Sequence, residues 1–167
     1  SAGRARAGRG AGCRDGRVVG VIAALGGSIA LVLSALSLLH LYWAVAGSGG
    51  EGAAIPEVGG KPAFTPGPLA CIAVAALLAA AAAVVSMRAG LWSLAWVPTW
   101  APPVGAWGVA AVFALRAVGD RKLVGFFKKV RGTRFARMDS ALYSPLCAVL
   151  AVVMIVIGGM EYMTSEL

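Results

Sequence analysis

The residues best suited to chemistry lie at the ends of long apolar stretches. They are His40, Tyr42, Trp43, Arg116, Asp120, Asp139 and Tyr143. If the stretches cross a membrane in alternating directions, these ends come to one face, with Glu51 and Glu57 in a connecting segment. A histidine can carry a proton near neutral pH, and an arginine can hold an anion. The group is either a pocket for a lipid headgroup or small molecule, or an interfacial network that fixes the helices, and the second interpretation is favoured.

Arg116 needs an acidic partner if it lies beside hydrocarbon, because an unpaired charge there is costly. Asp120 follows one helical turn later and is the nearest candidate, and Asp139 is the next. His40 has no second histidine, cysteine or carboxylate at the spacing of metal ligands. We therefore expect no metal, no other cofactor and no catalytic set.

Cys71 and Cys147 form a second candidate pair. They come shortly after Pro68 and Pro145, so each is expected near the start of a helix, where the pKa of a thiol is lowered. Apolar surroundings raise that pKa, and cysteine commonly behaves as a small buried hydrophobe. We expect packing residues, and a thiol-redox pair is the weaker hypothesis. With Cys13 the chain has 3 cysteines, which fit no complete disulfide framework and no zinc pattern.

Four apolar stretches have to position these residues. None contains an Asp, Glu, Lys or Arg, and they cover residues 18–46, 69–87, 91–115 and 140–160. About 20 apolar helical residues cross the hydrocarbon of a bilayer, which offers backbone groups no hydrogen bonds. Stretches rich in Ala, Leu and Gly do not alternate as barrel strands do. With 59% hydrophobic residues and a mean hydropathy of +0.82, the sequence predicts an all-α integral membrane bundle of four transmembrane helices.

The transmembrane domain is expected at 18–162, with a C-terminal tail at 163–167. Residues 1–17 are mostly Arg, Ala and Gly, which cannot bury enough apolar surface to fold, so we expect a disordered basic tail. An Arg-rich, acid-poor start is also typical of a targeting remnant or of a wrongly chosen start site. Little of the chain is left for a separate soluble domain.

Four crossings define two sides of the membrane. Side A carries both termini and the 88–90 turn, and side B carries the 47–67 and 116–139 loops. Most of the 15 Lys and Arg residues fall on side B, and without the N-terminal tail only Arg88 remains on side A. Because positive residues beside spans favour the cytoplasm, we expect the 116–139 loop to be cytoplasmic.

A short amphipathic interfacial helix is predicted at 121–131, between the third and fourth spans. At about 100° per residue one face is apolar, formed by Leu123, Phe126, Phe127 and Val130. The opposite face is basic, formed by Arg121, Lys122, Lys128 and Lys129. Such a helix turns its cations toward anionic lipid headgroups, and Gly132 would end it. The alternative is a solvated basic loop, because three turns are few for a stable helix.

The third span is interrupted by Pro98, Pro102 and Pro103 among tryptophans. Proline removes backbone hydrogen bonds, and tryptophan prefers the membrane interface. We therefore expect residues 91–100 to lie partly in the side A interface and the straight helix to begin near Ala101.

In the first span, Gly26, Ala30 and Ser34 recur at every fourth position. Small residues stacked on one helix face let a neighbouring backbone approach closely, which is how helices associate in lipid. These residues are the predicted contact with another helix.

Several function classes are disfavoured. No span carries a charge at mid-depth, which argues against an ion pathway or a proton-coupled transporter. The glycine-rich residues 47–50 end a helix rather than open one, so they form a turn and not a phosphate loop. The basic residues 121–137 lie beside the spans, where anionic lipid is nearer than nucleic acid, and no nucleic-acid partner is expected.

Short motifs of the chain resemble the small bacterial membrane proteins grouped as domain of unknown function 3995. The motifs are 40–44 (HLYWA), 54–56 (AIP), 61–64 (KPAF), 115–120 (LRAVGD), 124–128 (VGFFK), 135–139 (FARMD) and 143–147 (YSPLC). The resemblance covers about residues 20–157 and implies a four-helix protein of a bacterial plasma membrane. It implies no reaction, ligand or catalytic residue. Members have short N-termini, so the Arg-rich start departs from the pattern.

The predicted function is that of a non-catalytic membrane component. It is either an accessory subunit that packs against other membrane protein subunits, or a binder of lipid headgroups. The bilayer and its anionic headgroups are the expected partners, on a side B surface built from residues 40–68 and 116–147. The alternative is a membrane enzyme that acts on a lipid-soluble or quinone-like molecule, with His40, Arg116, Asp120 and Tyr143 around the substrate.

Overall fold

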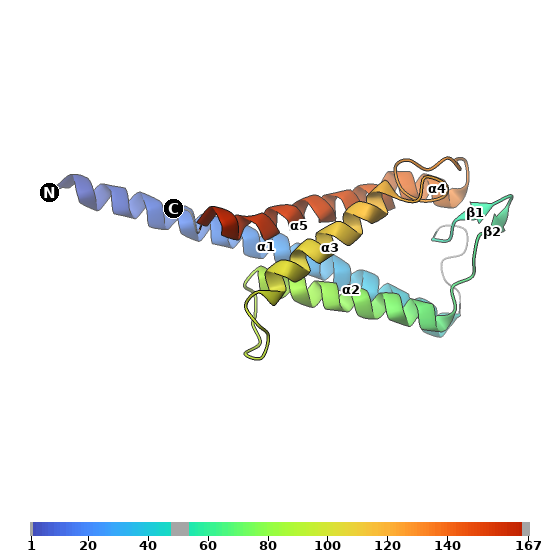
Figure 1. Ribbon diagram of the computed structural model, residues 1–167, viewed down its shortest axis with the longest axis horizontal. Helices are drawn as coiled ribbons and strands as arrows, with labels where there is room; N and C mark the ends of the chain where they lie inside the picture. The colour runs from blue at the N-terminus through green and yellow to red at the C-terminus, as the bar shows by residue number, and fades with distance from the viewer. Residues whose placement is uncertain (1, 48–53, 165–167) are drawn as a thin grey trace.

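Helices make up most of the structure (Figure 1). The computed structural model describes residues 2–47 and 54–164, with side chains for 16–47 and 54–159. Glu51 and the side chain of Cys13 lie outside these ranges. The elements are α1 (Ala2–Ala46), β1 (Glu57–Val58), β2 (Lys61–Pro62), α2 (Pro68–Arg88), α3 (Ala101–Val118), α4 (Arg134–Met138), the π-helical turn η1 (Asp139–Tyr143) and α5 (Ser144–Thr164).

The described residues contain 4 helical segments long and apolar enough to cross a membrane. They are Gly16–Ala46, Pro68–Arg88, Ala101–Val118 and Arg134–Gly159. The predicted all-α bundle of four such helices is confirmed. The third helix starts at Ala101, as expected, because prolines in its first turn need no hydrogen-bonded N–H there. Residues 91–100 form turns and no helix, with Trp96 and Trp100 exposed.

Helix α1 begins at Ala2, so residues 2–17, expected to form a disordered tail, are helical in the structure. Alanine and arginine rank among the strongest helix formers, and extending an existing helix costs far less than starting one. The division of the chain into two tails and a membrane domain stays a prediction.

The chain passes up and down between two ends of the bundle (Figure 1). Helix α1 starts and α5 finishes at the end that we named side A, which also holds the 89–100 loop. The β1–β2 hairpin and the loop between α3 and α4 lie at the opposite end, side B. His40 and Arg116 are therefore at the same end, as the alternating crossings predicted.

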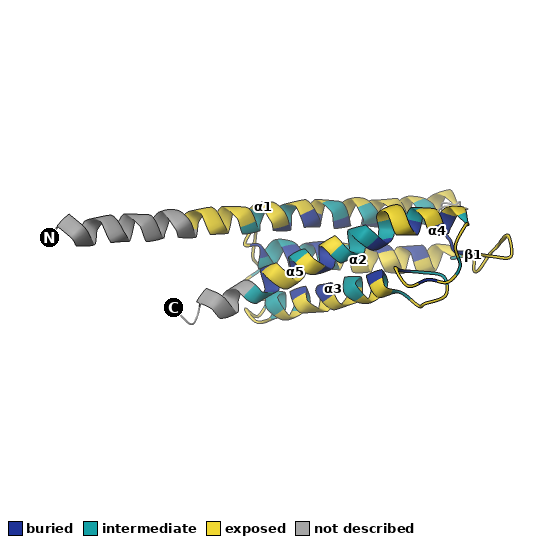
Figure 2. Ribbon diagram, turned by 90° about the horizontal axis from the view of Figure 1, so that it is seen from above, coloured by how far each residue is buried: buried dark blue, intermediate teal, exposed yellow. Residues whose placement is uncertain are grey.

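The apolar core lies in the half of the bundle nearer side A. Helix α1 packs along α2 and α3 packs along α5, and in Figure 1 the two pairs cross near side A and diverge toward side B. Buried residues recur along the helices, between exposed ones (Figure 2). The core residues are Ile29, Ala30, Leu33, Ala82, Val85, Ala106, Ala110, Leu150, Met154 and Ile157. The four helices share one core only where they converge.

Small residues bring α1 against α2, but only two of the three predicted residues take part in this contact. Gly26 and Ala30 are buried, and a Cβ at Gly26 would collide with the Cβ of Ala89. Ser34 is exposed, because each step of four residues rotates the position by roughly 40° around the helix. Ser37 takes its place and donates a hydrogen bond from Oγ to the carbonyl oxygen of Ala75, 2.8 Å away.

The connection from α1 to α2 contains the antiparallel β1–β2 hairpin, in which Glu57 pairs with Pro62 and Val58 with Lys61. Its two-residue turn, Gly59–Gly60, has positive φ at both positions, which glycine adopts without steric cost. Ile55, just before the hairpin, is buried at the side B end of the α1–α2 pair.

The predicted interfacial helix at 121–131 is wrong, because the segment between α3 and α4 is irregular up to Thr133. Gly119 ends α3 with positive φ, and the chain then folds back so that Phe126 N–H donates to the carbonyl oxygen of Ala117. The backbones at Gly119 and Gly125 touch so closely that neither position has room for a Cβ. The only short helix of this region is α4, five residues at Arg134–Met138 that run straight into η1 and the fourth span.

Candidate functional site

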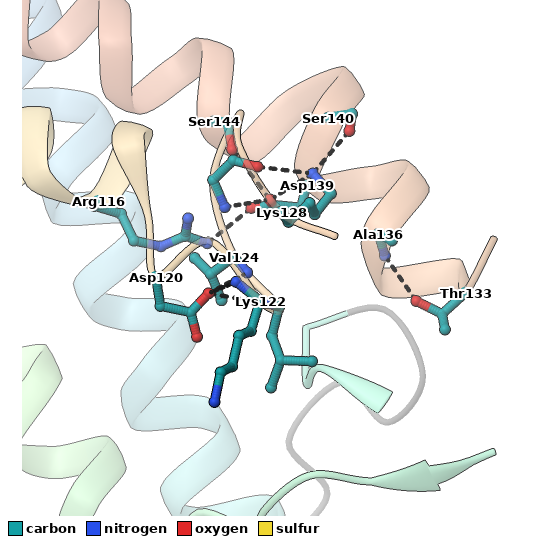
Figure 3. A network of polar contacts seen from close by, with 12 residues as sticks. Arg116, Asp120, Lys122, Val124, Lys128, Thr133, Ala136, Asp139, Ser140 and Ser144 are labelled. Carbon is teal, nitrogen blue, oxygen red and sulfur yellow. Dashed lines mark hydrogen bonds and ion pairs between the residues drawn. The ribbon is translucent and has the colours of Figure 1, made fainter. Parts of the chain in front are cut away.

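Asp139 is the centre of a polar cluster at the side B end of α3 and α5 (Figure 3). Its carboxylate is fully buried and accepts four hydrogen bonds. Oδ1 accepts from Arg116 Nη2 at 2.9 Å. Oδ2 accepts from Gly125 N–H and Lys128 Nζ, each at 2.9 Å, and from Ser144 Oγ at 3.1 Å. The hydrogen-bonding capacity of the carboxylate is thus filled by protein groups.

Lys128 is buried inside this cluster, which corrects its predicted place on a basic membrane-facing surface. Its Nζ donates to Asp139, to the carbonyl oxygen of Gly125 at 3.1 Å and to Ser140 Oγ at 2.8 Å. All three donors of the ammonium group are therefore used. Two cations, Lys128 and Arg116, meet one carboxylate, so the cluster carries one excess positive charge.

The π-helical turn η1 gives Asp139 and Ser144 a common direction. In an α-helix, residues five positions apart face in different directions, whereas an i to i+5 turn stacks them. The N–H of Ser144 donates to the carbonyl oxygen of Asp139, and the Ser144 hydroxyl donates to the carboxylate of the same residue. Both side chains are fully buried as a result. Thr133 starts this helical unit by accepting a hydrogen bond from Ala136 N–H at its Oγ1.

Asp120 does not pair with Arg116, although it was the nearest predicted partner. The backbone turns away after Gly119, and Oδ1 of Asp120 instead accepts from the N–H groups of Lys122, Leu123 and Val124 at 2.8–3.0 Å. These hydrogen bonds, that of Leu123 first, hold the pKa of the Asp120 carboxyl below its usual value. Asp120 shapes an exposed loop, and Asp139 is the acid that Arg116 meets.

Arg116 also borders an apolar groove between α2 and α3. The groove has a volume of about 500 Å³ and runs from Val84 and Gly105, near side A, to Val74 and Arg116, near side B. Every other lining residue is apolar. Nη2 of Arg116 is held by Asp139, whereas Nη1 makes no hydrogen bond to any described residue. The groove therefore combines a hydrocarbon-like wall with one guanidinium, which is about one-third exposed and whose Nη1 is buried without a hydrogen-bond partner among the described residues.

His40 lies in a different place from the Arg116 cluster. It borders a cavity of about 240 Å³ at the side B end of the α1–α2 pair, together with Trp43 and Cys71. Its Nδ1 is 2.8 Å from the carbonyl oxygen of Leu36, and its ring meets Trp43 edge-on at 5.0 Å. Tyr42 points outward and is exposed.

The predicted polar group is thus divided between two pairs of helices. Tyr143 packs against Phe135 at 6.2 Å, in the part of the molecule that holds Asp139. No hydrogen bond or ion pair joins His40 to Arg116 within the described residues. The cavity that His40 borders does not include Arg116, Asp120 or Tyr143, the other residues predicted around an enzyme substrate.

Cys71 and Cys147 are both free thiols. Cys71 is buried and borders the cavity of His40, while Cys147 is half-buried in α5. Within residues 16–47 and 54–159, no three His, Cys, Asp or Glu side chains gather as a metal site would require.

The exposed part of the α3–α4 loop is strongly basic. Arg121, Lys122 and Lys129 are exposed there, and Arg131, Arg134 and Arg137 extend the surface toward α4. Phe126 and Phe127 are exposed beside them. The amphipathic character expected of 121–131 is present in composition, on a loop rather than on a helix.

Sequence reasoning missed Lys128, Gly125 and Ser144 as members of the cluster. Nothing in the sequence separates Lys128 from its neighbour Lys129, because the direction of each side chain depends on the crossing at Gly119 and Gly125. The one available signal was Gly119-Asp120, a pair typical of a turn, a few residues after the predicted span that ends at 115.

The comparison with protein families identifies the relatives of this chain. The model of a family described as "Protein of unknown function (DUF3995)" matches residues 33–154. The chain belongs to this family. The matched region contains His40, Arg116, Lys128 and Asp139, and therefore both the cavity and the cluster described above. The DUF3995 resemblance predicted from the motifs is thus confirmed. No curated protein and no solved structure matches the chain.

Proposed function

We propose that this protein is a non-catalytic membrane component that binds an anionic lipid, with one acyl chain in the α2–α3 groove and the headgroup at Arg116. The observation that carries the proposal is the partly exposed guanidinium of Arg116, the one charged group that borders an otherwise apolar groove. A guanidinium suits phosphate and carboxylate oxygens, which can accept from more than one of its nitrogens.

The dimensions of the groove fit one leaflet of a bilayer. From Gly105 to Arg116 the helix α3 rises roughly 16 Å, about half of a ~30 Å hydrocarbon core. Arg116 belongs to the last turn of α3, where a headgroup would lie. A lipid in the side B leaflet would therefore place its acyl chain along Val112 and Gly108 and its charged headgroup beside the exposed part of the Arg116 side chain.

The charges around the site favour an anion. The buried cluster has two cations for one carboxylate, and the exposed loop adds Arg121, Lys122 and Lys129. Each Lys or Arg near an anionic membrane surface contributes about 1 kcal/mol of attraction. The same excess of positive charge supports a cytoplasmic position for the 116–139 loop in a bacterial plasma membrane.

Two variants test the binding of the acyl chain and the binding of the headgroup separately. Gly108 borders the groove, and a Cβ there meets no atom within 4 Å, so Gly108→Leu should fill the groove without disturbing the helix. Arg116→Gln removes the guanidinium. The control is Gly20→Leu, an equally open and exposed glycine of α1 outside the groove.

The measurement is native mass spectrometry of the protein in mild detergent with phosphatidylglycerol and with phosphatidylcholine of the same acyl chains. We expect wild type and Gly20→Leu to retain phosphatidylglycerol preferentially, Arg116→Gln to lose the preference, and Gly108→Leu to lose both lipids. Equal retention by all four proteins would refute the site. A protein subunit copurifying in place of lipid would favour the accessory-subunit role instead.

A further inference from the structure

The cavity at His40 has no part in the proposed lipid site. It lies between the last turn of α1, the first turns of α2 and the segment around the β1–β2 hairpin. None of the residues that border it belongs to the Arg116 cluster, and it shares only Val74 with the lipid groove. It is a separate hollow at the same end of the molecule.

The hydrogen bond to Leu36 fixes the chemistry of the histidine. A carbonyl oxygen only accepts hydrogen bonds, so Nδ1 of His40 must carry the proton that it donates across 2.8 Å. In the neutral ring the other nitrogen, Nε2, then carries a lone pair. No described residue donates to Nε2. A ring that borders the cavity therefore has, at Nε2, one hydrogen-bond acceptor without a partner among the described residues.

The walls of the cavity favour a flat apolar molecule. Trp43 and Phe64 provide aromatic surface, and Ile55 and Pro66 provide aliphatic surface. Besides the histidine, the polar side-chain groups of the lining residues are the indole N–H of Trp43 and the thiol of Cys71. Aromatic rings pack well edge-on or offset against such walls. A volume of about 240 Å³ accommodates one substituted ring and is below the ~300–1,000 Å³ of sites for larger ligands.

We propose that this cavity binds the single-ring head of a membrane-soluble hydroquinone or similar phenol, with a ring hydroxyl donating a hydrogen bond to Nε2 of His40. A phenol supplies the two features that the cavity lacks, a flat apolar body and one strong O–H donor. The apolar tail of such a molecule stays in the surrounding lipid. The site binds the hydroxylated ring and needs no electron transfer.

The test uses decylhydroquinone and its dimethyl ether, which has the same ring and tail but no O–H. Binding to the full-length protein in detergent is followed by isothermal titration calorimetry. Wild type should bind the hydroquinone about tenfold more tightly than the ether, the value of one hydrogen bond of about 1.4 kcal/mol. His40→Phe keeps an aromatic ring beside Trp43 and should bind both molecules equally weakly.

A second variant keeps the test decisive if His40→Phe does not fold. Ala70 borders the cavity but is exposed, so Ala70→Leu should fill the space and abolish binding of both molecules while leaving His40 intact. Gly108→Leu, which blocks only the lipid groove, should bind decylhydroquinone as wild type does. Equal affinity of wild type for the hydroquinone and the ether would overturn the proposal, and so would unchanged binding by Ala70→Leu.

Discussion

The two halves of this bundle are stabilised in different ways. Near side A the four helices converge on apolar residues such as Leu33, Val85 and Met154, which are fully buried. Toward side B the helix pairs diverge, and buried polar groups, Asp139 and Lys128 among them, hold α3, its loop and α5 together. The packed half fixes the fold, the divergent half provides the cavity at His40, and the lipid groove runs from one half to the other.

The difference has a physical cause. Close packing in lipid depends on van der Waals contact between small residues, as between Gly26 and Ala89, and such contact works only where backbones approach each other. The two pairs lose that contact where they diverge, and within the α3–α5 pair a buried ion cluster joins the helices to the loop between α3 and α4. We therefore expect the loss of one buried polar residue near side B to lower the free energy of unfolding more than a substitution in the apolar packing near side A does.

Removal of the Asp139 charge should have the largest effect. Asp139→Asn leaves Lys128 buried without a counterion, and breaking a buried ion pair in this way costs about 3–5 kcal/mol. The free energy of unfolding in mixed micelles measures this loss. The exposed Asp120→Asn is the control and should change it much less, whereas Asp139→Asn combined with Lys128→Met should recover part of the stability. An Asp139→Asn protein as stable as wild type would contradict the claim that the ion cluster stabilises the side B half.

A substitution at the side A contact should have a smaller effect. Gly26→Val places a side chain against Ala89 and forces α1 away from α2, for which about 1–3 kcal/mol is expected. The same unfolding measurement applies, with Gly20→Val as the matched control because that position has open space around it. If Gly26→Val were more damaging than Asp139→Asn, the packed half would be the more vulnerable one.

Titration of Asp120 should have the smallest of the three effects, on the exposed loop that this residue shapes. The pKa of Asp120 is lowered in the folded protein, so its stabilisation of the loop is complete above the ordinary aspartate pKa and is lost as the pH falls through the lowered value. The NMR shifts of the Leu123 and Val124 amide protons should follow this titration. In Asp120→Asn they should stay constant over the same range, and a titration that persists in that variant would assign the change to another group.

The fold could be predicted because the membrane-spanning helices follow from the length and polarity of the apolar stretches in the sequence. Uninterrupted apolar stretches predicted the four membrane-spanning helices, and prolines placed the start of α3 at Ala101. The cluster could not be predicted, since it depends on features that periodicity does not contain. The backbone crossing at Gly119 and Gly125 removes the helix expected at 121–131, and it turns Lys128 inward while Lys129 remains outside.

The π-helical turn η1 makes the fourth span sensitive to the number of residues between Asp139 and Ser144. Its extra residue offsets α4 from α5, so that one rotation of the helix suits the ion cluster and another suits the core around Met154. Deleting a single residue between Asp139 and Ser144 would convert the turn to ordinary α-helix and rotate one part by about 100° against the other. Either the carboxylate or the core face would then be misdirected. We therefore expect a deletion in this segment to disturb the fold more than a substitution of an exposed side chain such as that of Leu142.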